Sequence, residues 1–337
     1  MGSKLCFLCH HPFWEEPLGC GSLIRNRYTL LRKIVDDIHV IFITRSNKKS
    51  PLPGTTVTLG AGLTNSAINE IQDFLNKQNF KFIYSSYNLF DKILEGVRAF
   101  KICEIHDVMH LRQQAFEEMG YSAPYQTTKA DEIASLSAYD AIICINTNEE
   151  KYLKENSLTN VKYIPPNFSF NANVSGPNSK SFGIIGSAAK PNIDGFEFYK
   201  TQILNLEQVV IAGALSSNIG KVGYSSKNIS LLGVVRNVVE FYKKVDISLA
   251  PVRFGGGLKI KAIEAIAHGK PVFGTKHSLS GFPEGIEQVS IAEDRHNKWN
   301  VNNMEALFDI KKSTIKQYVD ENFSDLVCSM HFDDLLR

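Results

Sequence analysis

The sequence predicts an α/β protein with two doubly wound parallel-sheet domains that face each other across a cleft. Short apolar, β-rich runs alternate with amphipathic stretches, this alternation restarts halfway along the chain, and a polar segment separates the two halves. Continuous apolar strands separated by helices are typical of parallel sheets covered on both faces. A chain of 337 residues is long enough for two domains, each with its own core.

In the first half, five runs rich in β-branched and aromatic residues predict strands. These runs are 5–9, 39–44, 80–84, 102–105 and 141–145. The amphipathic stretches 22–35, 66–76 and 129–138 predict helices between them.

The second half repeats the pattern. Its predicted strands are 182–185, 209–212, 229–232, 247–251 and 271–273, and its predicted helices are 193–204, 238–244 and 258–268. Two further helical stretches, 311–322 and 325–335, have no strand after them. We therefore expect an N-terminal domain at 1–166, a linker at 167–180, a C-terminal domain at 181–315, and helices at 316–337 that return to the N-terminal domain.

Composition excludes several classes of protein. The net charge is +2 and no block of like charges occurs, so no nucleic-acid partner is expected. Six dispersed cysteines and the lack of a recognisable signal peptide or membrane-spanning run predict a cytoplasmic protein. The spacing Cys6-x-x-Cys9-His10 matches haem attachment, but it lies in a predicted buried strand, which favours two core cysteines.

The segment 251–275 carries the clearest chemical signal. A predicted buried strand ends at Pro251, and three glycines precede a predicted helix that begins near Leu258. Glycines at such a turn let a ligand approach the backbone, and a helix start favours an anion. The alternative is a glycine turn with solvated lysines. The predicted phosphate site consists of Arg253, Gly255, Gly256, Gly257, Leu258 and Lys259.

Glu264 lies in the same predicted helix among apolar neighbours. A carboxylate in such surroundings needs a partner, and a ribose diol would donate two hydrogen bonds to it. The alternative is a glutamate on the protein surface.

The segment 251–275 resembles the signature of GT-B glycosyltransferases of the family-4 type, the glycosyl transferases group 1, in which a glycine loop precedes Glu-Ala and Gly-x-Pro-Val. Other segments agree with that family in order, and the resemblance covers most of the chain. They are the loop 17–22 with Gly19 and Gly21, the strand end 104–107 with His106 and Asp107, the turn 164–167, Gly186-Ser187 followed by 191–195, and Gly233-Val234.

This resemblance implies a glycosyltransferase that moves a sugar from a nucleotide-diphosphate-sugar donor to a glycan, lipid-linked or other acceptor, with retention of configuration, in polysaccharide biosynthesis. It implies no metal or other cofactor, an acceptor-binding N-terminal domain and a donor-binding C-terminal domain. The implied catalytic residues are His106, Asp107, Arg253 and Lys259. The implied donor-binding residues are Gly19, Gly21, Gly186, Ser187, Gly233, Val234, Gly255, Gly256, Gly257, Leu258 and Glu264.

The chain departs from the family at two places. Gly256 stands where many members have a first glutamate, and Ser187 and Asn192 stand where many have Arg and Lys. Two alternatives stay open: a nucleotide-sugar epimerase, which shares the GT-B architecture, and a catalytically silent nucleotide-sugar-binding subunit, which would keep the C-terminal site.

The loop 10–22 is expected to face the acceptor. Its Phe13 and Trp14 could stack on a sugar or touch the inner face of a membrane, or they could simply pack within the loop. His106 and Asp107 could likewise be a capping pair at a strand end.

Overall fold

A computed structural model describes residues 4–15, 19–44, 48–58, 64–221, 227–293 and 299–336. The chain divides into two compact units. Unit 1 contains Met1–Gln114, Ser122–Asn167 and Cys328–Arg337, and unit 2 contains Ala115–Tyr121 and Phe168–Val327. Of the predicted return segment 316–337, only the part from Cys328 onward belongs to unit 1.

Unit 1 is built on a parallel sheet, which has seven strands within the described residues. The strands are β1 (Lys4–Cys9), β2 (Asp37–Thr44), β3 (Gly54–Thr58), β4 (Phe82–Ser86), β5 (Phe100–Ile105), β6 (Ala141–Cys144) and β7 (Val161–Tyr163), in the spatial order β3-β2-β1-β4-β5-β6-β7. The helices that begin in this part of the chain are α1 (Cys20–Ile34), α2 (Asn65–Gln78), α3 (Asp91–Leu94), α4 (Met109–Glu118), α5 (Lys129–Leu136) and α6 (Thr147–Glu155).

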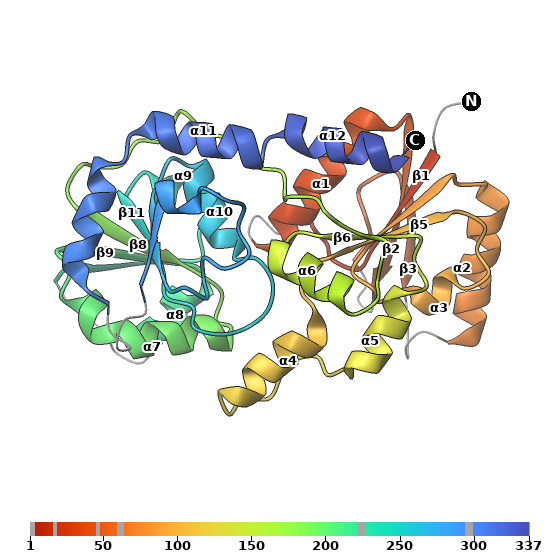
Figure 1. Ribbon diagram of the computed structural model, residues 1–337, viewed down its shortest axis with the longest axis horizontal. Helices are drawn as coiled ribbons and strands as arrows, with labels where there is room; N and C mark the ends of the chain where they lie inside the picture. The colour runs from red at the N-terminus through yellow and green to blue at the C-terminus, as the bar shows by residue number, and fades with distance from the viewer. Residues whose placement is uncertain are drawn as a thin grey trace. The chain divides into compact units, whose positions relative to one another are not determined.

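Unit 2 repeats this architecture with a six-stranded parallel sheet over the residues described. Its strands are β8 (Ser181–Ile185), β9 (Gln208–Ala212), β10 (Ile229–Gly233), β11 (Ile247–Ala250), β12 (Val272–Gly274) and β13 (Ser290–Ala292), in the order β10-β9-β8-β11-β12-β13. Its helices are α7 (Lys190–Leu204), α8 (Ala214–Lys221), α9 (Val238–Tyr242), α10 (Ile260–Ala267), α11 (Lys312–Asn322) and the start of α12 (Asp325–Leu336), with 3-10 turns at Ile286–Gln288 and Val301–Asp309. Helices α7 and α8 cover one face of the sheet, and α9 and α10 cover the other (Figure 1).

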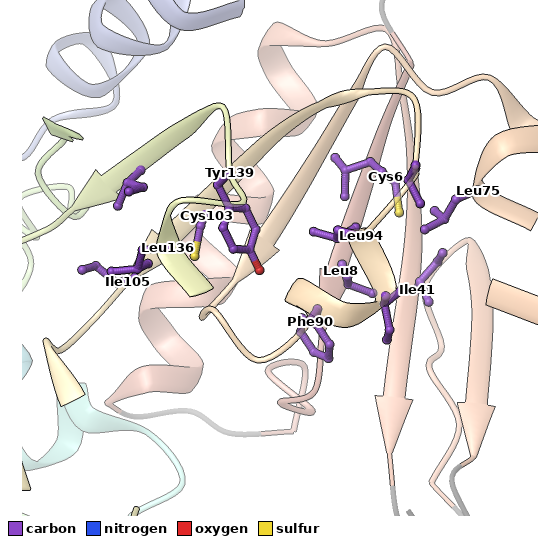
Figure 2. Packing of buried hydrophobic residues seen from close by; sticks show 14 of the residues in the cluster. Cys6, Leu8, Ile41, Leu75, Phe90, Leu94, Cys103, Ile105, Leu136 and Tyr139 are labelled. Carbon is purple, nitrogen blue, oxygen red and sulfur yellow. The ribbon is translucent and has the colours of Figure 1, made fainter. Parts of the chain in front are cut away.

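Strand β1 shows why the predicted strands are apolar throughout. Cys6 and Leu8 pack in one buried cluster with Ile41 and Leu75 (Figure 2). Leu5 and Phe7, which alternate with them, pack in a second cluster with residues of α1. Because successive side chains point to opposite faces of a sheet, burial on both faces requires an apolar residue at every position.

The last residues of α12 complete the second of these clusters. Cys328 and Phe332 are fully buried there, and the ring of Phe332 lies 6.4 Å from that of Tyr84 and under the Arg27 guanidinium. This packing explains why Cys328–Arg337 belongs to unit 1 although it ends the sequence.

Three strands have no counterpart among the predicted ones. β3 has the sequence GTTVT, and none of its five residues is buried, which suits an edge strand. β7 and β13 have only three residues each. β3 is polar, and β7 and β13 each have only one buried residue, so none of the three forms an apolar run that the sequence could reveal.

Candidate functional site

The strand order of unit 2 reverses between β8 and β11. From β8 the chain runs outward to β9 and β10, and it then adds β11 on the other side of β8. Ligands of doubly wound folds bind at the carboxyl ends of the strands beside such a reversal. Gly186 and Ser187 directly follow β8, and the loop with Gly255, Gly256 and Gly257 follows β11. The fold therefore brings two of the predicted donor-binding segments to one edge of the sheet.

Backbone segments pack without side chains between them at this edge. A Cβ atom on Gly195 of α7 would lie 2.1 Å from the carbonyl oxygen of Pro251, and one on Gly213 would lie 2.2 Å from that of Gly186. Contacts this short leave room for glycine only. Gly195 thus sets how closely α7 approaches the segment that leads into the predicted phosphate loop, and Gly213 sets how closely the β9–α8 turn approaches Gly186.

Two glycines of the predicted phosphate loop have left-handed backbone conformations. Gly255 and Gly257 have φ angles of 114° and 65°, which other residues rarely adopt. Lys259 caps the start of α10, and its Nζ donates to the carbonyls of Gly256 and Gly257, each at 2.8 Å. Leu258 is buried. Helix α10 begins at Ile260, two residues later than predicted. The side chain of Lys259 folds back over the loop.

Arg253 forms a bidentate ion pair with Asp194 of α7. The Nε–Oδ2 distance is 2.8 Å and the Nη2–Oδ1 distance is 2.9 Å. The guanidinium also stacks on Phe198, with 3.7 Å between its carbon and the ring centroid. The predicted phosphate-binding cation is thus held in one orientation with part of its charge balanced, and sequence reasoning did not assign Asp194 this role.

Glu264 is 3% exposed, so it is not a surface residue. Its Oε2 lies 3.2 Å from the Nζ of Lys261, which is 29% exposed. Burial, with a further contribution from the Glu264 charge, raises the pKa of the neighbouring Tyr242 well above its usual value. Lys261 therefore supplies part of the pairing that a carboxylate in such surroundings requires.

Gly233 and Val234 lie at the end of β10, two strands away from β8. Gly233 has a φ angle of 67°, and it donates its N–H to Ser216 and accepts from the N–H of Gly213. The side chain of Val234 is 68% exposed. The hydrogen bonds link this turn to the β9–α8 turn, and an apolar side chain stays uncovered beside it.

In unit 1 the strand order reverses between β1 and β4. His106, which follows β5, is 4% exposed, and its Nδ1 lies 2.9 Å from the hydroxyl of Tyr87, which follows β4. Its Nε2 lies 3.4 Å from Oε1 of Glu104. Glu104 in turn pairs with the fully buried Arg27 of α1 at 2.6 Å.

This arrangement perturbs the pKa values of its members. Desolvation alone would raise the pKa of Glu104, but the Arg27 charge outweighs it, and the pKa falls to about 2. Desolvation would lower the pKa of His106, but hydrogen bonds to Cys20 and Glu104 outweigh it and raise the pKa to about 9. Glu104 lies in a buried strand, and a carboxylate in an apolar run is the signal by which sequence analysis could have recognised that Glu104 needs a buried partner, although not which one.

The other predicted residues of unit 1 fall into three groups. Gly19 precedes α1 with a φ angle of 63° and Gly21 lies in its first turn, whereas Pro17 and Leu18 of the same loop lie outside the described residues. Asp107 forms an ion pair of 2.9 Å with Arg112. Phe13 is 1% exposed, so it contacts neither a sugar nor a membrane.

Phe13 and Trp14 pack within the unit, as one of the two interpretations of this loop predicted. The ring of Phe13 lies 5.8 Å from that of Phe7, and the ring of Trp14 lies 4.8 Å from that of Phe42. Over the described residues, no helix is long and apolar enough to span a bilayer, and no group of three or more His, Cys, Asp or Glu side chains could hold a metal ion.

Two family models match the chain. Residues 179–309 match the glycosyl transferases group 1 model, and residues 78–168 match the model of the glucosyltransferase 3-like N-terminal domain. A search of curated protein sequences finds no significant match.

Several solved structures share the fold over the full chain. Anabaena HepE in complex with UDP and glucose superposes with a TM-score of 0.70 at 11% identity, covering 99% of both chains. Staphylococcus aureus TarM gives 0.72 at 10% identity and 99% coverage of both. The pneumococcal O-GlcNAc transferase GtfA in complex with UDP and GlcNAc gives 0.69 at 10% identity, covering 99% of this chain and 98% of that one.

These likenesses agree with the two parallel sheets and confirm the GT-B fold that the sequence predicted. The chain has the GT-B fold of glycosyltransferases, and its residues 179–309 match the glycosyl transferases group 1 model.

Proposed function

We propose that this enzyme transfers a sugar from a UDP-sugar donor to a glycan or lipid-linked acceptor, with retention of configuration and without a metal ion. The observation that carries the proposal is the meeting of Gly186 and the glycine loop at the carboxyl ends of β8 and β11. The UDP complexes of HepE and GtfA support uracil as the base.

In the proposed reaction, the bond between the sugar C1 and the diphosphate oxygen breaks, and a bond from C1 to an acceptor oxygen forms. Negative charge develops on the leaving UDP. The N–H groups of the glycine loop and the cations Arg253 and Lys259 would stabilise this charge without a metal. The acceptor hydroxyl releases its proton to solvent or to a neighbouring base. His106 and Asp107 would contact the sugar or the acceptor.

We further propose that Glu264 accepts hydrogen bonds from the ribose hydroxyls. It lies on α10, whose start adjoins the glycine loop, and its carboxylate is buried. A hydrogen bond to a charged group contributes about 1.5–3 kcal/mol, so Glu264→Ala should lower the affinity for uridine and for UDP about ten- to a hundredfold. Glu264→Gln should recover part of it, because its amide oxygen still accepts.

Calorimetry with uridine and UDP on both variants tests this role. Wild-type affinity of Glu264→Ala for uridine would show that Glu264 serves only α10 and Lys261. Equal losses in the Gln and Ala variants would argue against a hydrogen bond to the ribose.

The nucleotide and the reaction class need two separate measurements. Saturating UDP at 100 times its dissociation constant should stabilise the protein by about 2.7 kcal/mol, whereas ADP and GDP should have smaller effects. A panel of UDP-sugars with product analysis then distinguishes transfer from epimerisation and from binding without turnover. Epimerised donor, or an unchanged donor with every acceptor, would refute the proposed transfer.

A further inference from the structure

A cavity of about 330 Å³ lies in unit 2 at the amino ends of its strands. Three of the residues that line it show its position: Lys180 precedes β8, Asp246 precedes β11 and Pro271 precedes β12. The glycine loop lies at the opposite edge of the same parallel sheet, and strands of three to five residues separate the two edges by roughly 10–15 Å. Small-molecule sites have volumes of about 300–1,000 Å³, so this cavity has room for a small ligand of its own.

Lys270 borders this cavity with an amine that has no direct partner. The residue is 3% exposed, and its Nζ forms neither a hydrogen bond nor an ion pair with any residue that the structure describes. A Cβ on Gly176 would lie 3.0 Å from Nζ and 2.1 Å from Oδ1 of Asp246, and Gly176 and Asp246 also line the cavity. A buried charge is costly without a partner, and a ligand in the cavity would supply one.

Asp246 does not provide the missing partner, because its carboxylate is engaged elsewhere. Oδ1 accepts from the N–H of Asn178, and Oδ2 accepts from the N–H groups of Ser179 and Ser181 and from the Ser181 hydroxyl, each at 3.1 Å. These bonds fix the segment that forms one wall of the cavity. The charge of Asp246 therefore acts on Lys270 without a direct bond, and the amine can still form an ion pair with a ligand.

The other charged groups around the amine leave a positive excess. Burial lowers the pKa of Lys270 to about 8; Asp246 opposes this effect and Lys312 adds to it. Lys312 itself donates to two carbonyls of the linker at 2.8 Å, and Lys180 pairs with Glu305 at 3.4 Å. Three ammonium groups thus accompany two carboxylates, and the excess positive charge favours an anion as the ligand.

Another part of the cavity wall is apolar. It consists of Leu307, Phe308 and Ile310, which come from the 3-10 turn Val301–Asp309 and the residue after it. A ligand with one negative charge and an apolar body suits both parts of the wall. A phosphate dianion does not, since the other two ammonium groups already have partners and the neighbouring aspartate would oppose a second negative charge.

We propose that this cavity is a binding site for a small carboxylate with an apolar body. The carboxylate accepts a hydrogen bond from the ammonium group of Lys270, and the apolar body packs against Leu307, Phe308 and Ile310. The site lies apart from the proposed donor site, so it is a second ligand site that does not depend on the proposed glycosyl transfer.

The test uses benzoate as the probe and benzamide as its neutral analogue. The protein is labelled with ¹³C at the ε carbon of lysine, and the NMR signal of Lys270 is assigned by its loss in Lys270→Met. We expect benzoate to shift this signal in a saturable way and benzamide to leave it unchanged. Because the carboxylate binds the charged amine, its affinity should fall about tenfold between pH 7 and pH 9, where Lys270 loses its proton and His268, whose pKa burial lowers, stays neutral.

Two variants and a matched control locate the site by calorimetry. Lys270→Met should lower the benzoate affinity about tenfold or more, whereas Lys243→Met, the same change at an exposed lysine, should leave it unchanged. Ile310→Ala, which removes part of the apolar wall, should weaken benzoate several-fold and acetate less. An apolar side chain of similar volume often replaces a buried charge without loss of stability, so we expect Lys270→Met to fold.

Three results would each overturn the proposal: equal affinity for benzamide and benzoate, unchanged benzoate binding in folded Lys270→Met, or tighter binding of phosphate than of benzoate. If Lys270→Met does not fold, calorimetry of wild type and Ile310→Ala decides. An affinity that does not change with pH, or equal affinities in the two proteins, would contradict the site, and the expected dependence on both would support it. No sugar donor or acceptor is used, so failure of the proposed transfer would leave the result unaffected.

Discussion

Gly195 offers the most direct test of how unit 2 positions its phosphate loop. It lies inside α7, and a Cβ at this position would lie 2.1 Å from the oxygen and 2.8 Å from the carbon of the Pro251 carbonyl. Both atoms belong to the backbone, so no side-chain rotation relieves the contact. In Gly195→Ala, either α7 or the end of β11 must move by about 1 Å to restore an ordinary van der Waals distance.

The magnitude follows from two opposing effects. Alanine gains about 1 kcal/mol over glycine inside a helix, whereas overpacking costs about 1–3 kcal/mol and occasionally more. Because the clash is with backbone, we expect the upper end of that range and a net loss of about 2 kcal/mol. For a unit of this size, that lowers the melting temperature by roughly 4–8 °C. Gly220 of α8 is the matched control, since a Cβ there would only touch Leu231 at 3.4 Å.

Calorimetric melting of both variants, with and without UDP, checks this reasoning. Gly220→Ala should melt at or slightly above the wild-type temperature and respond normally to UDP. Gly195→Ala should melt earlier and show a smaller UDP-induced shift, because the displaced segment leads into the glycine loop. Wild-type stability of Gly195→Ala would refute the claim that glycine is required for this close approach.

Three further predictions concern charge. Arg253→Ala should weaken UDP binding about ten- to a hundredfold and leave uridine binding nearly unchanged. Asp194→Asn, which releases the guanidinium from its bidentate pair, should weaken UDP binding less. If calorimetry finds that Arg253→Ala loses as much affinity for uridine as for UDP, Arg253 does not bind the diphosphate. Glu104→Gln should destabilise the protein by about 3–5 kcal/mol at pH 7, because it leaves Arg27 without its buried counter-charge. The folded-state pKa of Glu104 is depressed to about 2, so its contribution to stability is present above the unfolded-state pKa near 4.5 and is lost as the pH falls toward 2. In urea unfolding, the difference in free energy of unfolding between wild type and Glu104→Gln should therefore decrease between pH 4.5 and pH 2. A chelator should leave sugar transfer unchanged, and an activity abolished by chelation and restored by Mn²⁺ or Mg²⁺ would refute the proposed metal independence.

Much of the architecture could be predicted because burial on both faces leaves a signal in the sequence. The ten predicted strands all overlap strands of the structure, since each is an apolar run between amphipathic or polar segments. The glycine loop and Glu264 could be picked out for a similar reason: three successive glycines, and a carboxylate in an otherwise apolar helix, are unusual in ordinary secondary structure. β3, β7 and β13 escaped prediction because strands that are polar or very short leave no such pattern.

The sequence by itself determined the class of fold and the segments that bear glycines and charges, because these depend on local composition and periodicity. Only the tertiary structure decided which charges meet. Arg253 and Asp194 are 59 residues apart, and Arg27 and Glu104 are 77 apart, so no local pattern links the partners. His106 and Tyr87 likewise meet only because parallel strands bring their carboxyl ends to one edge of a sheet, where residues distant in the chain become neighbours.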